Sequence, residues 1–136
     1  MISQGSRSTA ISVSAWRSGR RRWTCAFRTF SPEIPTPSCC ISVAGLDTRI
    51  FRVDPPPGVD WFDVDYPEVI ELRRKLYPSR DHYHLVASSV TQPDWLAEVP
   101  RNRPAIVVAE GLTPYLPAHE GHACLRGLSR ILPVAN

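Results

Sequence analysis

Apolar and polar residues follow two periods along this chain, one typical of strands and the other of helices. Short apolar runs predict strands at residues 59–64, 83–87 and 104–109. Between and after these runs, apolar residues recur at helical spacing, which predicts helices at residues 67–76, 92–99 and 117–132. Because strands and helices alternate, we expect an α/β fold with a parallel sheet and right-handed crossovers.

The best-defined helix is expected at residues 67–76, where a proline occupies the first turn. The spacing of its apolar residues assigns one face to the sheet and the opposite face to solvent. The residues expected to face the sheet are Val69, Ile70, Leu72 and Leu76. The residues expected to stay mostly solvated are Arg73, Arg74 and Lys75.

Residues 1–40 differ from the rest of the chain. They are rich in Ser, Thr and Arg and lack either period, so we expect a disordered N-terminal third. Six arginines and a single acid, Glu33, precede position 41, whereas ten basic and twelve acidic residues follow it. A nucleic-acid binder that uses Arg20, Arg21 and Arg22 ranks last among the functions considered, because the segment lacks a folded recognition element.

Cysteine and histidine spacing does not favour a metal site. The four cysteines, which have no zinc or redox spacing and are expected to be free thiols, are Cys25, Cys39, Cys40 and Cys124. His119 and His122 are three positions apart without a third ligand nearby, which favours a solvated helix face. We also expect His82 and His84 to face opposite sides of their strand. No signal peptide or membrane-spanning run is found, so a cytoplasmic location is expected.

A glycine turn and a carboxylate have the spacing of a nucleotide site. Gly45 opens the run Gly-Leu-Asp-Thr-Arg, and Asp65 follows it by twenty positions, at the end of a predicted strand. In open parallel sheets, this is the spacing between a nucleotide-binding glycine turn and the carboxylate that holds a ribose hydroxyl. The alternative is that Asp63 or Asp65 caps the helix that begins at Pro67.

Two further charged residues refine the ligand class. Arg49 is a candidate to pair with a ligand carboxylate, although a plain surface position is the alternative. Glu110 ends a buried apolar strand, where an unpaired carboxylate is costly, and is a candidate to pair with a ligand ammonium. A ligand with a ribose, a carboxylate and an amino group describes S-adenosylmethionine better than a dinucleotide. The absence of a GxGxxG or GxxxxGK[ST] motif also argues against NAD or ATP as the ligand.

Three ordered motifs resemble the leucine carboxyl methyltransferase-like family, which includes O-methyltransferases of the tetracenomycin type. The motifs are the run at 45–49, the strand Trp61–Asp65 followed by Tyr-Pro-Glu-Val, and Ala-Glu-Gly-Leu at 109–112 before Tyr115. The resemblance covers roughly residues 41–126. It implies an incomplete Rossmann-like class I methyltransferase sheet within a partial domain at residues 41–136.

The resemblance also implies the cofactor S-adenosyl-L-methionine and roles for single residues. Gly45 would belong to the first glycine motif, Asp65 would bind the ribose, and Glu110 would lie near the methionine part of the cofactor. Ser88, Ser89 and Val90 fall where the family places an adenine-contacting loop. That loop often contains an acidic residue, so the serines are a departure from the family pattern.

The chain departs from the family pattern upstream of the turn. The family's first strand ends in Gly-x-Gly, whereas residues 41–45 read Ile-Ser-Val-Ala-Gly, and the helical segment that covers the cofactor is unrecognisable. The chain also stops before the last strands of the family's sheet. Suitable codons for residues 35–44, read two nucleotides later, spell an apolar strand that ends in Gly-x-Gly. We therefore hypothesise that residues 1 to about 43 are read out of frame.

The function expected is that of a fragment of an S-adenosylmethionine-dependent O-methyltransferase. The methyl acceptor would be a small molecule or a carboxylate, with no membrane partner. Tyr115 and the loop at 113–117 are the candidates for lining the acceptor pocket. The alternative is a non-catalytic remnant of a disrupted methyltransferase gene.

Overall fold

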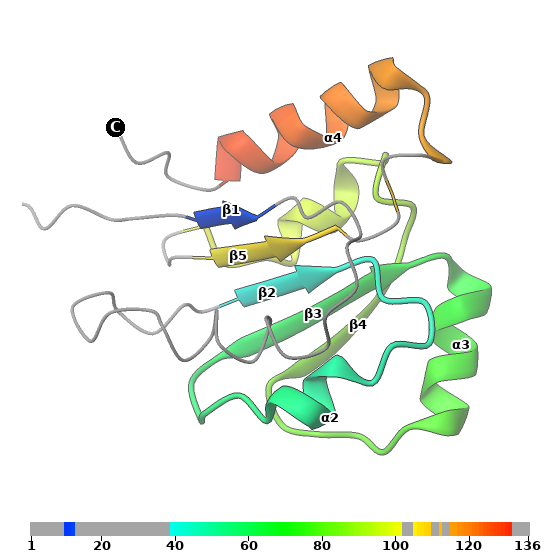
Figure 1. Cartoon of the computed structure of the whole chain (residues 1–136), viewed down its shortest axis with the longest axis vertical. Coiled ribbons are helices and arrows are strands. Elements are labelled where there is room, and N and C mark those ends of the chain that lie inside the picture. The colour runs from blue at the N-terminus through cyan, green and yellow to red at the C-terminus, as the bar shows by residue number, and fades with distance from the viewer. Residues whose placement is uncertain (1–9, 13–38, 102–104, 110–111, 113–114, 132–136) are drawn as a thin grey trace, which may run out of the picture.

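The computed structural model describes residues 10–12, 39–101, 105–109, 112 and 115–131 (Figure 1). Its elements in chain order are β1 (Ala10–Ser12), β2 (Cys39–Ser42), α2 (Arg49–Val53), β3 (Asp60–Asp65), α3 (Pro67–Leu76), β4 (Tyr83–Ala87), the 3-10 helix η1 (Asp94–Ala97), β5 (Ala105–Val108) and α4 (Ala118–Ile131). All five strands pair in parallel in one sheet, which confirms the expected α/β, partial Rossmann-like fold. Within these ranges, no helix is both long and apolar enough to cross a membrane.

The order of the strands reverses beside β2. The sheet order is β1-β5-β2-β3-β4, so the chain runs from β2 outward to β3 and β4 and then returns to β5 on the other side of β2. Ligands of open α/β sheets bind at the carboxyl ends of the strands at such a reversal. Ser42, the last residue of β2, pairs with Asp63 of β3 and with Val108 of β5. The loop that follows β2 therefore lies where a ligand is expected.

Apolar side chains pack on both faces of the sheet. Phe62 and Val64 of β3 belong to a core cluster that joins the sheet to Trp95 and Leu96 of η1 and Leu128 of α4. The alternate β3 residues point to the other face, because side chains alternate along a strand. There Trp61 packs in a second cluster with Ile50 of α2 and Val108, with Phe51, Val53 and Tyr83 against it. The site described below is built on this second face.

Most expected elements are present within one or two residues of their expected bounds. The helix at 67–76 and the strand at 83–87 have the expected bounds, whereas the helix expected at 92–99 is the short 3-10 helix η1. Strand β1, which pairs with β5, lies in the N-terminal third, where no strand was expected. Residues 1–9 and 13–38 lie outside the described part of the chain, so the disorder expected there stays a prediction.

The inward face of α3 corrects the sequence analysis. Ile70 and Arg73 are both 0% exposed, whereas Leu72 and Leu76 are 43% and 56% exposed. The expected burial of the two leucines and the expected solvation of Arg73 were therefore wrong. An arginine faces inward because Asp63, on the adjoining face of β3, is itself only 2% exposed and forms an ion pair with it. The residues of α3 that follow expectation are the buried Ile70, the partly buried Val69, and the exposed Arg74 and Lys75.

Candidate functional site

The site begins with a tight turn after β2. The backbone N–H of Asp47 donates to the carbonyl oxygen of Ala44 at 2.8 Å, which closes the turn over Gly45 and Leu46. Gly45 has a φ of +48°, a region that residues with a Cβ rarely adopt. The chain then enters the short helix α2 at Arg49. The turn therefore depends on glycine at its first central position.

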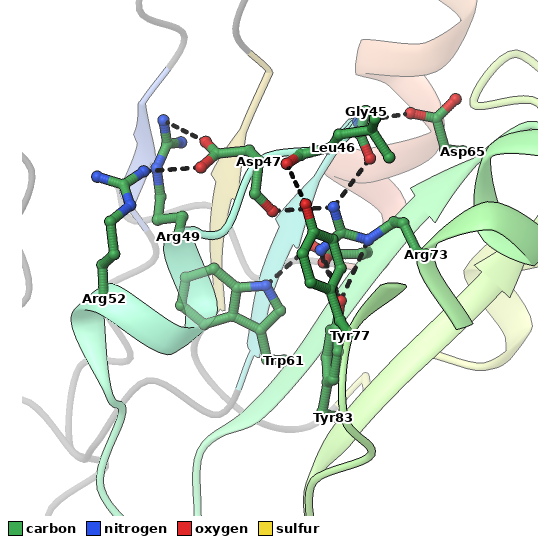
Figure 2. A network of polar contacts seen from close by, with 11 residues as sticks. Gly45, Leu46, Asp47, Arg49, Arg52, Trp61, Asp65, Arg73, Tyr77 and Tyr83 are labelled. Atoms are coloured by element: carbon green, nitrogen blue, oxygen red, sulfur yellow. Dashed lines mark hydrogen bonds and ion pairs between the residues drawn. The ribbon is translucent and has the colours of Figure 1, made fainter. Parts of the chain in front are cut away.

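Asp65 contacts this turn directly from the end of β3. Its Oδ2 accepts the backbone N–H of Gly45 at 2.9 Å (Figure 2). Its Oδ1 accepts the backbone N–H of Tyr66 at 2.8 Å. The two residues that the sequence placed twenty positions apart are therefore hydrogen-bonded. The capping alternative is wrong, because the N-cap of α3 is Tyr66, and neither Asp63 nor Asp65 occupies that position.

Asp63 lies beneath the turn and is enclosed by donors. Its Oδ2 accepts Arg73 Nη2 and the Tyr83 hydroxyl, each at 2.6 Å, and its Oδ1 accepts Trp61 Nε1 at 2.9 Å. Burial, followed by the hydrogen bond to Asp63, raises the pKa of Tyr83 well above its usual range. Asp63 is thus part of a buried polar cluster, in which donors of the protein itself occupy both of its carboxylate oxygens.

Arg73 joins this buried cluster to the glycine turn, a role that the sequence analysis missed. Its Nη1 donates to the carbonyl oxygens of Gly45 at 2.8 Å and Asp47 at 2.9 Å. At the C-cap of α3, four residues after Arg73, the Tyr77 hydroxyl donates to the carbonyl oxygen of Leu46 at 2.7 Å. Figure 2 shows both side chains reaching the turn from the same side. The available sequence signal was the aspartate within an apolar strand, which requires a buried partner.

Arg49 lies beside the turn and is paired in this structure. Its Nη2 is 3.0 Å from Oδ2 of Asp47, whose Oδ1 is 2.7 Å from Arg52 Nη2. The Arg49 side chain is largely buried, whereas that of Arg52 is exposed. An arginine is therefore held at the rim of the turn by a carboxylate.

The loop after β4 adjoins Asp65. The backbone N–H of Ser88 donates to the carbonyl oxygen of Asp65 at 2.9 Å, which ties the two strand ends together. Ser89 is half-buried and shares a hydrogen bond of 2.9 Å with the Thr91 hydroxyl. Val90 packs in the core, and its carbonyl oxygen accepts Trp95 Nε1 at 3.2 Å. The structure thus brings this loop to the same sheet edge as Gly45 and Asp65.

Two other candidates stay untested by the described part of the chain. Glu110 lies outside the described residues, although β5 ends just before it, at Val108. Tyr115 is 84% exposed, and its backbone N–H donates to the carbonyl oxygen of Leu112 at 3.0 Å. Their proposed roles stay predictions.

The expectation for the strand histidines was wrong. His82 Nδ1 and His84 Nε2 lie 3.0 and 3.3 Å from the same oxygen, Oδ1 of Asp60. His82 immediately precedes β4, with a φ of +60°, and His84 lies within that strand, so both side chains reach the carboxylate of Asp60 at the start of the neighbouring strand β3. They lie at the start of β4, at the opposite sheet edge from the turn. Within the described ranges, no three His, Cys, Asp or Glu side chains form a group suited to a metal ion.

Of the four cysteines, the structure describes the side chain of Cys124. It is a free, half-buried thiol in α4, and burial raises its pKa. The side chains of Cys25, Cys39 and Cys40 lie outside the described part of the chain.

Comparison with known proteins identifies similar sequences. The family model for leucine carboxyl methyltransferase matches residues 40–129. The chain is 61% identical over 89 residues to the tetracenomycin polyketide synthesis O-methyltransferase TcmP of Streptomyces glaucescens, across 65% of this chain and 33% of that protein. It is 37% identical over 108 residues to the S-adenosyl-L-methionine-dependent methyltransferase dpfgK of Gibberella zeae, across 74% of this chain and 36% of that protein. The chain thus spans about a third of the length of these relatives.

Proposed function

This chain belongs to the leucine carboxyl methyltransferase family, and on that basis we propose that residues 41–136 form part of an S-adenosylmethionine-binding O-methyltransferase domain. The observation that carries the proposal is the hydrogen bond of 2.9 Å between the Gly45 N–H and the Asp65 carboxylate, at the strand-order reversal. This is the arrangement of glycine turn and acid that open α/β sheets use to hold a ribose.

The donors and acceptors of the turn fit this cofactor. Each oxygen of Asp65 accepts one backbone N–H and keeps a lone pair, so the carboxylate can accept both ribose hydroxyls. Arg49, held at the rim by Asp47, would bind the carboxylate of the methionine part. Ser89 and Val90 would adjoin the adenine, and Glu110 would pair with the ammonium.

The methyl acceptor is proposed to be a small molecule with a reactive oxygen. When bound, S-adenosylmethionine supplies a methyl group on a sulfonium, which passes to the acceptor oxygen and leaves S-adenosylhomocysteine. The protein's contribution would be to hold the two reactants in line at attack distance. A carboxylate acceptor needs no deprotonation at neutral pH, whereas an alcohol or phenol needs a base. Tyr115 is the candidate for lining the acceptor pocket.

Cofactor binding and turnover are separate proposals for this chain. The turn, Asp65 and Arg49 lie within the matched residues, and they support binding. Methyl transfer is proposed for the protein of the relatives' full length, of which the chain spans about a third. The second candidate, a non-catalytic remnant, is favoured by Val43, which stands where the family has the first glycine of Gly-x-Gly.

Calorimetric titration of the purified chain with S-adenosylhomocysteine tests the proposal. We expect saturable binding, weakened by about tenfold or more in Asp65→Asn, because the variant loses a charge-assisted acceptor for the ribose. Asp81→Asn, at an exposed position before β4, is the matched control and should bind as the wild type. No saturable binding by a folded wild-type chain would favour the remnant.

A further inference from the structure

Resting on the proposed cofactor site, we propose that Arg73 is a positioning residue that, with Tyr77, holds the glycine turn in its cofactor-binding shape. Three successive carbonyl oxygens of the turn, those of Gly45, Leu46 and Asp47, accept hydrogen bonds from these two side chains. Arg73 takes the first and third carbonyls, and Tyr77 takes the second. These three carbonyls are thus directed toward α3 and its C-cap.

The peptide groups of Gly45 are held from two directions. Its N–H donates to Asp65 at 2.9 Å and its carbonyl oxygen accepts Arg73 at 2.8 Å. Rotation of the turn would break at least one of these bonds, and both partners sit on the β3–α3 unit. The shape of the turn is therefore set before a ligand arrives, which lowers the ordering cost of binding.

All five N–H groups of the Arg73 side chain have a partner, which explains why arginine suits this position. Its Nη1 reaches the two turn carbonyls, its Nη2 reaches Asp63 and Tyr83 at 2.6 Å each, and its Nε reaches Tyr83 at 3.2 Å. The Tyr83 hydroxyl donates its own proton to Asp63. The Arg73 Cζ lies 5.0 Å from the centre of the Tyr77 ring, a cation–π contact within one helical turn. Lysine, with one nitrogen and three donors, cannot reproduce this fork.

Stability alone is a weak reason for such a buried ion pair. The pair between Asp63 and Arg73 is 2% and 0% exposed, and burial of two charges offsets most of their attraction. Apolar residues of similar volume often serve stability equally well at such positions. What an apolar pair cannot do is donate to the turn carbonyls, so we assign the ion pair to the geometry of the site.

Conservative variants separate positioning from stability. Arg73→Lys keeps a positive charge for Asp63 and loses the fork to the turn, whereas Tyr83→Phe removes a hydroxyl from the same cluster and leaves both turn contacts intact. We expect Arg73→Lys to raise the Kd for S-adenosylhomocysteine by about tenfold or more, and Tyr83→Phe to change it by less than about twofold. Arg74→Lys, at an exposed neighbouring position on α3, is the control and should match the wild type.

Urea unfolding and amide hydrogen exchange complete the experiment. Exchange at the Gly45 and Asp47 amides should be faster in Arg73→Lys than in Tyr83→Phe, even where the two variants are equally stable. Equal affinity and equal exchange in both variants, or wild-type affinity in Arg73→Lys, would overturn the positioning role. Should the wild-type chain bind no S-adenosylhomocysteine, the proposed function fails. The exchange comparison then still decides whether Arg73 orders the turn.

Discussion

At the scale of single residues, Gly45 adopts a backbone conformation that favours glycine, although a side chain at this position would not clash with any neighbour. Its φ is +48°, yet a Cβ built on it would meet no atom within 4 Å. A substitution there therefore acts through backbone strain and not through a clash.

Gly45→Ala should consequently destabilise the fold by about 1 kcal/mol and weaken cofactor binding as well. Gly58, with a φ of +96° and the same open surroundings, lies in an exposed loop before β3 and provides the control. Gly58→Ala should lower the free energy of urea unfolding and leave the Kd for S-adenosylhomocysteine unchanged. If both variants bind equally well, the shape of the turn at Gly45 does not govern the site.

Tyr83 gives the fold a dependence on alkaline pH. Its pKa is raised in the folded state by burial and by the hydrogen bond to Asp63, so folding favours the neutral phenol. This contribution is fully present below the unfolded pKa of about 10 and is lost as pH rises toward the higher folded pKa, because the unfolded chain ionises first. The free energy of unfolding should therefore fall as the pH rises above about 10.

Tyr83→Phe should remove this part of the pH slope, at a lower starting stability. Tyr115→Phe is the control, since Tyr115 is 84% exposed and makes no part of the buried cluster around Asp63. Urea unfolding at several alkaline pH values measures the slope for each variant. A slope unchanged by Tyr83→Phe would contradict the raised pKa.

At the scale of elements, α3 could bury either of two helical stripes. The stripe through Val69, Leu72 and Leu76 is entirely apolar, and hydrophobic periodicity favours it. The buried stripe instead runs through Ile70 and Arg73, because the strand beneath carries Asp63.

The two stripes predict different mutational effects. Ile70→Ala should cost about 2–5 kcal/mol of unfolding free energy, the range for a large core side chain. Leu72→Lys and Leu76→Lys should each change it by no more than about 0.5 kcal/mol, as expected for exposed positions. A large loss in both lysine variants, measured by urea unfolding, would show that the leucines are buried in solution.

The sequence was sufficient where the signal was local. Continuous apolar runs located β3, β4 and β5, and the spacing of Gly45 and Asp65 located two ends of one hydrogen bond. The sequence did not predict the burial of Arg73, because the partner that explains this burial, Asp63, lies in another element. Strand β1 was also missed, because three residues in an aperiodic segment carry no pattern.

At the scale of the whole molecule, the family match covers most of the described structure but leaves out the N-terminal strand β1. The family match begins at residue 40, within β2, and covers every later described element except the last residues of α4. The hypothesis that residues 1 to about 43 are read out of frame concerns the segment before this match together with its first few residues, and it stays a prediction.

The nucleotide sequence of the locus tests this hypothesis directly. We expect a second frame, running into the codons for Leu46-Asp47-Thr48-Arg49, to encode an apolar strand that ends in Gly-x-Gly, with a helical segment before it. The repaired product should then bind S-adenosylhomocysteine more tightly than this chain, because the turn regains its first glycine. If the other frames contain no such strand, the arginine-rich leader is genuine.

The contacts that shape the glycine turn all come from a short span of chain. Its partners are Asp65, Arg73 and Tyr77, and the cluster behind them ends at Tyr83. During synthesis, residues near the N-terminus leave the ribosome first and can pack before later segments exist. The turn can therefore form its hydrogen bonds before β5 and α4 have been synthesised. The nascent chain would then already hold the glycine turn against Asp65 before its sheet is complete.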